Sequence, residues 1–175
     1  MHEPYDYATF LGVRPRDAVA SVTGGVVVGA WSGAGSIGWF DDETVVLSSG
    51  SVQPAAAGAQ VVRLVATVRP THEPAPLAAG GVFAHRWFEI DDADWDEFVA
   101  LSESSWPAFE AAYGATIEGF FRAPGRVLLL TRYPSLAAWA ESRGILREDA
   151  GKGFLRRREL TKRSIVRVAP LLPSP

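Results

Sequence analysis

The chain has 175 residues, no cysteine and a formal net charge of −3. This length suits one large domain or two small halves, and it allows a core to be buried without disulfides. The missing cysteines exclude a thiolate zinc site and a cysteine nucleophile, and the slightly acidic charge argues against a nucleic-acid binder.

The N-terminal stretch MHEPYDYATF lacks the basic start and the apolar run of a signal peptide. Apolar runs elsewhere fall short of the roughly 18 residues that a membrane-spanning helix needs. The sequence therefore predicts a cytoplasmic protein with no membrane span.

Residues 1–70 form a strand-rich first half. Apolar and β-branched runs predict strands over 5–13, 26–35, 43–49 and 60–71, with a short helix drawn over 14–24. The stretch GSVQPAAAGA (50–59) is too short, and too rich in glycine and proline, for a second helix. We therefore expect a degenerate half, in which the formation of the short helix stays open.

A linker is predicted over residues 71–80, THEPAPLAAG, which show no hydrophobic periodicity. Charged residues also become denser after this point. The predicted organisation is an N-terminal half over 1–70, a linker over 71–80 and a C-terminal half over 81–175.

The second half opens with a predicted strand over 81–90 and continues with a helix that Asp91 or Asp92 can cap. Aromatic residues at helical spacing give this helix one apolar face, Pro107 is expected to kink or restart it, and Gly114 to end it. Two strands follow around a Pro-Gly turn within 115–133. Ser135 can cap a second helix, a helical stretch runs through GFLRRRELTKR, and SIVRVAPLL closes as a strand.

The resulting order, β-α-β-β-α-β, is that of a ferredoxin-like unit. The predicted fold class is α+β, with tandem ferredoxin-like halves of which the second is complete and the first degenerate.

Several motifs of residues 80–175 resemble the NIPSNAP family of the dimeric α/β-barrel superfamily. They are Arg86 with Phe88 in the first strand, EGFF at 118–121, TRYPSLAAW at 131–139 and the proline-bearing last strand. The resemblance implies two ferredoxin-like sheets that face each other around a barrel, as a homodimer or as a tandem repeat. For this chain it predicts a pseudo-dimer, and it leaves a homodimer of the whole chain open. The family implies no defined reaction.

Residues 33–38, GAGSIG, match the pattern of a dinucleotide-binding turn. Such a turn needs a helix directly after it, whose N-terminal N–H groups hold the pyrophosphate. The residues that follow, WFDDETVVLSS, predict an acidic turn and a strand instead. The interpretation is a loop in which glycine permits tight turning and close packing, and no cofactor is expected.

Two charged clusters invite a binding hypothesis. DDADWDE (91–97) spaces its carboxylates like the start of a calcium loop, but it lacks the required glycine and terminal glutamate. Acids at the start of a helix explain it better, so no metal site is predicted. LRRRELTKR (155–163) is interpreted as a solvated face near a helix end.

His85 is the main candidate site residue. Strand alternation groups it with Phe83 and Trp87, opposite Ala84, Arg86 and Phe88. In the related haem-degrading monooxygenases a polar catalytic residue occupies the position that His85 matches, and the position of a third-strand tryptophan is matched by Thr131. Their haem-ligating histidine has no counterpart here, which argues against haem chemistry. The predicted ligand-contacting residues are Phe83, His85, Trp87, Leu129, Thr131 and Tyr133.

Two functions stay open. The first is a non-catalytic protein that binds a small apolar ligand in the barrel or acts through protein contacts. The second is a small cofactor-independent monooxygenase or isomerase-like enzyme that uses His85 with Arg132, Thr131 or Tyr133. A hydrogen-bonded core histidine without a site role is the simplest alternative for His85.

Overall fold

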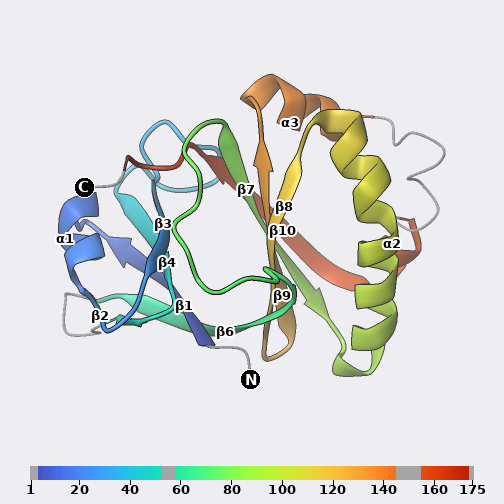
Figure 1. The fold of residues 1–175 in the computed structure, drawn as a ribbon, viewed down its shortest axis with the longest axis horizontal. Helices are drawn as coiled ribbons and strands as arrows, with labels where there is room; N and C mark the ends of the chain where they lie inside the picture. Colours follow the sequence, from blue (N-terminus) through green and yellow to red (C-terminus); the bar gives the residue numbers. More distant parts are fainter. Residues whose placement is uncertain (1–3, 53–57, 145–154, 174–175) are drawn as a thin grey trace.

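The computed structural model describes residues 4–52, 58–144 and 155–173. Their main feature is an antiparallel eight-stranded sheet in the order β10-β7-β9-β8-β6-β1-β4-β3 (Figure 1). The strands of its first four-stranded block are β1 (Pro4–Leu11), β3 (Val27–Ser32), β4 (Glu43–Ser48) and β6 (Gln60–Arg69). Those of the second are β7 (Val82–Ile90), β8 (Thr116–Ala123), β9 (Arg126–Tyr133) and β10 (Thr161–Ala169). A small separate sheet pairs β2 (Val22–Thr23) with β5 (Ser51–Val52).

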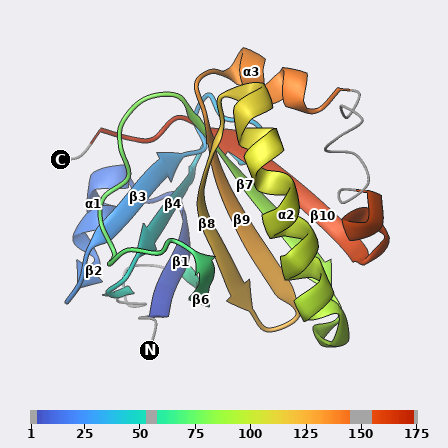
Figure 2. The same cartoon turned by 45° about the vertical axis from the view of Figure 1, so that its right-hand side comes forward.

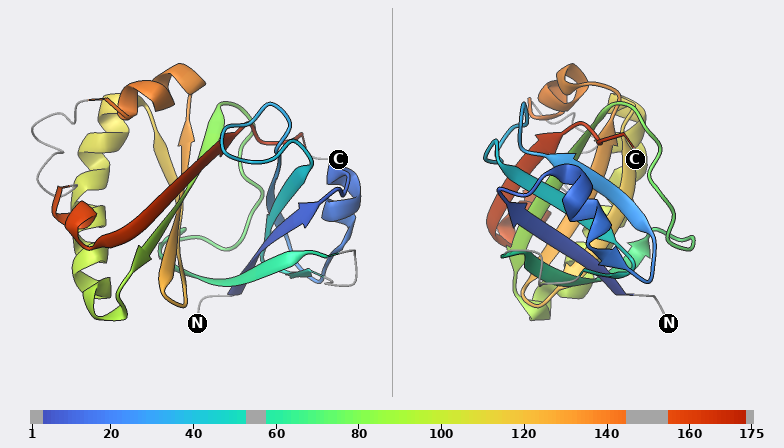
Figure 3. Two further views of the ribbon diagram at one scale, coloured as in Figure 1. Left: turned by 180° about the vertical axis from the view of Figure 1, so that it is seen from behind. Right: turned by 90° about the vertical axis from the view of Figure 1, so that its left-hand side faces the viewer.

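The sheet curls until its two ends meet. Ile37, in the loop after β3, and Val168 of β10 exchange backbone hydrogen bonds of 2.8 and 2.9 Å. Further along, Leu172 N donates to Ala30 O of β3 at 2.9 Å. Figure 3 shows this closing side, where β10 runs toward the loop after β3.

The helices lie outside the curled sheet. Helix α1 (Pro15–Ala20) packs on the first block, whereas α2 (Trp95–Tyr113) and α3 (Leu136–Ser142) pack on the second (Figure 2). Residues 155–159 form a further helical segment just before β10. The short helix that the sequence left open therefore forms, with Pro15 at its start.

Helix ends confirm part of the sequence-based expectations. Gly114 ends α2 in a left-handed conformation (φ 59°), and Ser135 Oγ accepts from Ala138 N at the start of α3. Helix α2 contains Pro107 as one uninterrupted element. The predicted aspartate cap is wrong, because a 3-10 turn over Asp92–Asp94 leads into α2 and neither flanking aspartate makes a side-chain capping bond.

The aspartates at this turn form ion pairs with residues of β8 and β10 instead. Asp91 pairs with Lys162 near the start of β10, and Asp92 lies 3.0 Å from Arg122 of β8. Strand β10 itself begins at Thr161, a few residues before the predicted SIVRVAPLL, so the helical stretch ends earlier than its sequence suggested. The stretch 50–59, in which no helix was expected, contains β5. Its residues 53–57 lie outside the described part of the chain.

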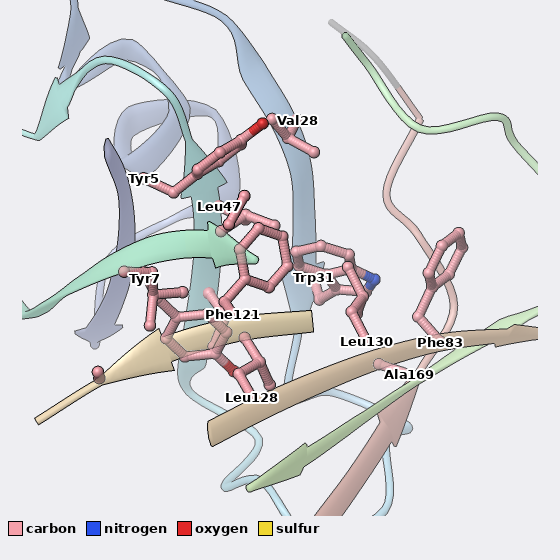
Figure 4. Packing of buried hydrophobic residues seen from close by; sticks show 14 of the residues in the cluster. Tyr5, Tyr7, Val28, Trp31, Leu47, Phe83, Phe121, Leu128, Leu130 and Ala169 are labelled. Atoms are coloured by element: carbon pink, nitrogen blue, oxygen red, sulfur yellow. The ribbon is translucent and has the colours of Figure 1, made fainter. Parts of the chain in front are cut away.

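The core has an inner and two main outer layers. The inner cluster lies inside the curled sheet and draws residues from both four-stranded blocks, among them Tyr5, Trp31, Leu64, Phe121 and Leu130. In Figure 4 the side chains of Tyr5, Trp31, Phe121 and Leu130 gather between strands of the two blocks. One outer cluster lies beneath α2 and the other beneath α1. The sheet thus has two buried faces along β7.

Candidate functional site

Strand β7 carries candidate functional side chains on both of its faces. Phe83 and His85 are fully buried on the inner face, and half-buried Trp87 packs against the same inner cluster. Ala84 and Phe88 lie on the outer face, where they join the clusters around the helices. The grouping that alternation predicted is present, and the His85 side faces into the curled sheet.

His85 sits in an aromatic cage. Its Nδ1 lies 3.0 Å from the Tyr7 hydroxyl, and the rings of Trp31 and Trp39 stand edge-on to it at centroid distances of 4.3 and 4.8 Å. Its Nε2 and the indole nitrogens of both tryptophans are buried without a hydrogen-bond partner among the described residues. A neutral imidazole is the form that such a setting tolerates.

Burial controls the acid-base behaviour of this cage. Burial, and to a smaller extent the nearby Arg167 cation, lower the pKa of His85 to about 3. Burial also raises the pKa of the Tyr7 hydroxyl, so Tyr7 stays protonated at neutral pH. His85 is therefore neutral at physiological pH and, with no exposed surface, has no direct access to solvent.

The six predicted ligand-contacting residues do not lie together. Cross-strand register pairs His85 with Leu130, so the inward residues of β9 are Leu128 and Leu130. Leu129, Thr131 and Tyr133 project from the opposite face, toward the helices. The sheet separates them from Phe83, His85 and Trp87, because directly opposed residues of an antiparallel pair share a face.

A cleft of about 610 Å³ opens on the outer face of the second block. Its floor comes from β7, β9 and β10, and its walls from α2, α3 and the helical segment 155–159. We call it the outer cleft. Apolar lining residues are Ala84, Phe88, Trp106, Phe109, Ile117, Leu129, Tyr133, Trp139 and Val166. His85 is not a lining residue.

Six cationic side chains also line the outer cleft, namely Arg86, Arg143, Arg157, Arg158, Lys162 and Arg163. No aspartate or glutamate lines it among the residues that the structure describes. Arg157 is buried, with 4% of its surface exposed, and donates from Nη1 to Ser102 Oγ at 3.2 Å. Arg86 donates from Nε to Ser164 Oγ at 3.0 Å.

The guanidinium groups of Arg86 and Arg157 both lie against the ring of Phe88. The guanidinium carbons of Arg86 and Arg157 lie 4.9 and 5.1 Å from the centre of Phe88. Burial, and to a smaller extent the Arg86 cation, lower the pKa of Arg157 to about 9. Burial and Arg143 likewise lower the pKa of Arg86 to about 10. Both arginines remain cationic at neutral pH, at an electrostatic cost.

Two neighbouring hydroxyl groups also line the outer cleft. The Ser142 hydroxyl lies 3.4 Å from the Tyr133 hydroxyl, and both residues line the outer cleft. Burial raises the pKa of Tyr133, so its hydroxyl is protonated at neutral pH. The outer cleft therefore combines an apolar floor, cations and one phenolic proton.

The basic residues of this site escaped the sequence analysis. The run LRRRELTKR was interpreted as a solvated face, whereas Arg157 turns inward onto Phe88 and Phe98. Arg86 entered the sequence analysis only through the family-like motif of the first strand, and the structure places it in the outer cleft, where it donates to Ser164 Oγ. The sequence did contain one signal for this site. Alternation placed Arg86 on the same face of its strand as Ala84 and Phe88, and a cation on an apolar face of a sheet is unusual.

The GAGSIG stretch forms the loop that closes the sheet. Residues 33–42 contain no helix, and β4 follows them directly. Gly33 N donates to Glu43 O at 2.7 Å, and Gly38 (φ 86°) lies against the backbone of β10. Without a helix at this point the loop lacks the N–H groups that a pyrophosphate requires.

No group of three or more His, Cys, Asp or Glu side chains among the described residues could hold a metal ion. No helix in the same part of the chain is long and apolar enough to cross a membrane.

The fold is shared with solved structures at low sequence identity. A monooxygenase-like protein from Listeria innocua matches with a TM-score of 0.60 and 8% identity, over 98% of this chain and 96% of that one. An anthrone oxidase-like protein matches with a TM-score of 0.62 and 11% identity, over 99% and 92%. A NIPSNAP family protein from Agrobacterium tumefaciens is 23% identical over 57% of this chain and 91% of its own, with a TM-score of 0.46.

No protein-family model and no curated protein matches the sequence. The structural likenesses establish a ferredoxin-like α+β fold with an eight-stranded curled antiparallel sheet. A ferredoxin-like fold is also what the order of elements predicted for residues 81–175.

Proposed function

We propose that this chain binds a small organic molecule with an apolar body, and that it does so in the outer cleft. The observation that carries the proposal is the cleft itself, about 610 Å³ over a floor of aromatic and aliphatic side chains. Ligand sites in proteins are concave, mostly apolar and of this size. The space inside the sheet is occupied by the inner cluster, so the proposal moves the ligand from the barrel to the helix-covered face.

The architecture proposed with it is a pseudo-dimer of two ferredoxin-like halves. Within the second block the order β10-β7-β9-β8 is that of strands 4-1-3-2 of one such unit. Within the first, β6-β1-β4-β3 repeats the same order. One half carries two helices on its outer face and the outer cleft between them, which explains why a site would form in that half.

A cleft-filling variant tests the binding proposal. Val166 lines the outer cleft, whereas its neighbour Ile165 faces the other way, opposite Trp87. The probe is N-phenyl-1-naphthylamine, a neutral apolar fluorophore. We expect saturable binding to the wild type, at least tenfold weaker binding to Val166→Trp and unchanged binding to Ile165→Trp. No saturable binding, or equal affinity in all three proteins, contradicts the proposal.

A second candidate is a cofactor-independent oxygenase or isomerase-like enzyme. The observation that favours it is the Tyr133 hydroxyl, a protonated group beside Ser142 within the cleft wall. His85 would not serve this reaction, because the sheet lies between it and the outer cleft. Tyr133 would donate or accept the proton that such chemistry moves.

Anthrone is a suitable probe for this candidate, since one protein of similar fold carries that substrate in its name. Oxidation of anthrone by dioxygen yields anthraquinone and water, with the electrons supplied by the substrate. An oxygen electrode should record protein-dependent uptake that Tyr133→Phe reduces at least tenfold. Uptake no faster than in buffer contradicts the enzyme candidate and leaves the binding proposal standing.

A further inference from the structure

The inner cluster contains three ring side chains in contact that the proposed function does not use. They are Tyr7, His85 and Trp87, and we call them the aromatic triad. The ring of Tyr7 stands edge-on to that of His85 at a centroid distance of 5.7 Å and to that of Trp87 at 5.3 Å. Tyr7 and His85 are buried, whereas Trp87 is half-buried. The triad therefore connects a buried phenol to solvent through one indole ring.

The hydrogen bonds of the triad determine where the Tyr7 proton lies. The Trp87 side chain hydrogen-bonds to the Tyr7 hydroxyl. Its indole N–H can only donate, so the Tyr7 oxygen accepts that bond. The hydroxyl proton of Tyr7 is left for its other partner, Nδ1 of His85, at 3.0 Å. In this arrangement Nδ1 is the unprotonated nitrogen of a neutral imidazole. Tyr7 thus has a base in direct contact with its hydroxyl group.

We propose that Tyr7 and His85 form a reversible one-electron redox site, which an oxidant in solvent reaches through Trp87. The oxidant, an outer-sphere one-electron acceptor, takes an electron from Trp87 and is thereby reduced. Tyr7 then gives one electron to Trp87 and its hydroxyl proton to His85 Nδ1. The products are intact Trp87, a neutral tyrosyl radical and an imidazolium. One electron from a reductant in solvent reverses the sequence, and the proton returns to Tyr7. This activity is independent of ligand binding in the outer cleft.

The proton moves only after Tyr7 has lost an electron. Burial and, to a smaller extent, Arg167 lower the pKa of His85 to about 3, and burial raises the pKa of Tyr7, so both groups are neutral in the resting protein. An oxidised phenol is a far stronger acid than an imidazolium of this pKa, and its proton then passes to His85. Arg167 lies 3.9 Å from the Glu43 carboxylate, which offsets part of its repulsion of the new positive charge.

The radical should rest on Tyr7 and not on a tryptophan of the same cluster. Trp31 and Trp39 also contact the imidazole, but their indole nitrogens are buried without a hydrogen-bond partner in the described parts of the chain. Without an acceptor they cannot release a proton, and a buried indole cation is costly. The guanidinium of Arg126 lies 5.2 Å from the ring centre of Trp87, which disfavours a lasting positive charge there.

Flash photolysis tests this site in the unmodified protein. Tris(bipyridine)ruthenium, excited by a laser flash and quenched irreversibly by pentaamminechlorocobalt, supplies a one-electron oxidant in solution. Transient absorption and electron paramagnetic resonance distinguish tyrosyl from tryptophanyl radicals. We expect a long-lived tyrosyl radical that forms at least twofold more slowly in heavy water, because a proton moves with the electron. Absence of this radical, or equal rates in the two solvents, contradicts the proposal.

Substitutions of the pair locate the radical and its base. Tyr7→Phe should abolish the long-lived tyrosyl signal, whereas Tyr5→Phe should retain it, since Tyr5 is an equally buried tyrosine of the same strand. His85→Gln keeps a hydrogen-bond acceptor that cannot take the proton, and it should lower the tyrosyl yield at least tenfold. Each variant is measured at a temperature where circular dichroism shows it folded. An unchanged tyrosyl yield in Tyr7→Phe or in His85→Gln contradicts the proposal.

A pair of tryptophan variants tests the route from solvent. Trp87→Phe should slow the formation of the tyrosyl radical at least tenfold, because Tyr7 itself is buried. Trp95→Phe is the matched control. Trp95 is also half-buried beneath an arginine, with the guanidinium of Arg122 4.6 Å from its ring centre, but it belongs to α2 outside the curled sheet. An equal effect of the two substitutions on the rate contradicts the route through Trp87.

Discussion

The Tyr7 hydroxyl on β1 lies 3.0 Å from Nδ1 of His85 on β7, although 78 positions separate the two residues in the chain. This contact joins the first strand of one four-stranded block to the first strand of the other. Both side chains are buried, and the Tyr7 ring also stands edge-on to Trp87 at 5.3 Å. A polar contact at the centre of an apolar cluster fixes how the two blocks face each other.

Tyr7→Phe should lower the free energy of unfolding by about 1–3 kcal/mol, because His85 Nδ1 would be left buried without its partner. Urea denaturation at neutral pH measures the change. Tyr113→Phe is the matched control, since the Tyr113 hydroxyl makes no hydrogen bond with the described residues and Tyr113 is half-buried at the C-terminal end of α2. A loss no larger than that of the control would show that the contact does not contribute.

Stability should also depend on pH through His85. Its pKa is about 3 in the folded protein and about 6.5 in an unfolded chain, so between these values the unfolded state binds more protons. The folded state therefore loses stability as the pH falls from 6.5 toward 3, by up to about 1.4 kcal/mol per pH unit.

His85→Gln should remove this contribution and make the pH dependence shallower by about one proton. Urea unfolding at several pH values between 4 and 7 measures the slope. His72→Gln, which replaces an exposed histidine, should leave the slope unchanged. An identical slope in the wild type and His85→Gln would mean that His85 does not titrate on unfolding in this range.

The sequence identified the strands of both blocks and the face that His85 shares with Phe83 and Trp87, because alternation depends only on residues close in the chain. It grouped Thr131 and Tyr133 with His85 wrongly, because register decides which residues of β9 oppose those of β7. A shift of one residue exchanges the two faces. Register depends on turns and on contacts across the sheet, which a single sequence does not display.

Arg157 shows a second limit of sequence reasoning. Its neighbours in the chain are charged, and a run of this kind usually lies in solvent. The residue is buried because its guanidinium lies over the rings of Phe88 and Phe98, which come from β7 and α2. Only tertiary packing decides that one arginine of the run turns inward, and this packing also creates the outer cleft.

The GAGSIG loop should be sensitive to substitution for steric reasons. A Cβ atom at Gly33 would lie 1.7 Å from the Phe40 carbonyl oxygen, which belongs to the backbone and cannot move aside without opening the loop. At Gly35 the same atom would meet nothing within 4 Å, although φ is 71° there.

Gly33→Ala should therefore lower the melting temperature more than Gly35→Ala, whose cost is limited to the left-handed conformation, about 1 kcal/mol. Differential scanning calorimetry compares the two variants. Equal losses would indicate that the backbone conformation, and not the contact with Phe40, determines the requirement for glycine at position 33.

His85 and Val166 lie on opposite faces of the sheet, and their substitutions should have opposite effects on stability and on ligand binding. His85→Ala removes a fully buried ring and leaves the Tyr7 hydroxyl without its partner, so we expect a loss of at least about 2 kcal/mol in unfolding free energy. Its affinity for N-phenyl-1-naphthylamine should remain within twofold of the wild type, because the sheet separates His85 from the outer cleft.

Val166→Trp should show the reverse, with at least tenfold weaker binding of N-phenyl-1-naphthylamine. Its stability should stay within about 1 kcal/mol of the wild type, since Val166 is half-buried and its side chain borders the cleft. Thermal unfolding and a fluorescence titration on the same preparations measure both properties. A tenfold loss of probe affinity in His85→Ala, at a temperature where that variant is folded, would return the ligand to the inner face of the sheet and His85 to the site.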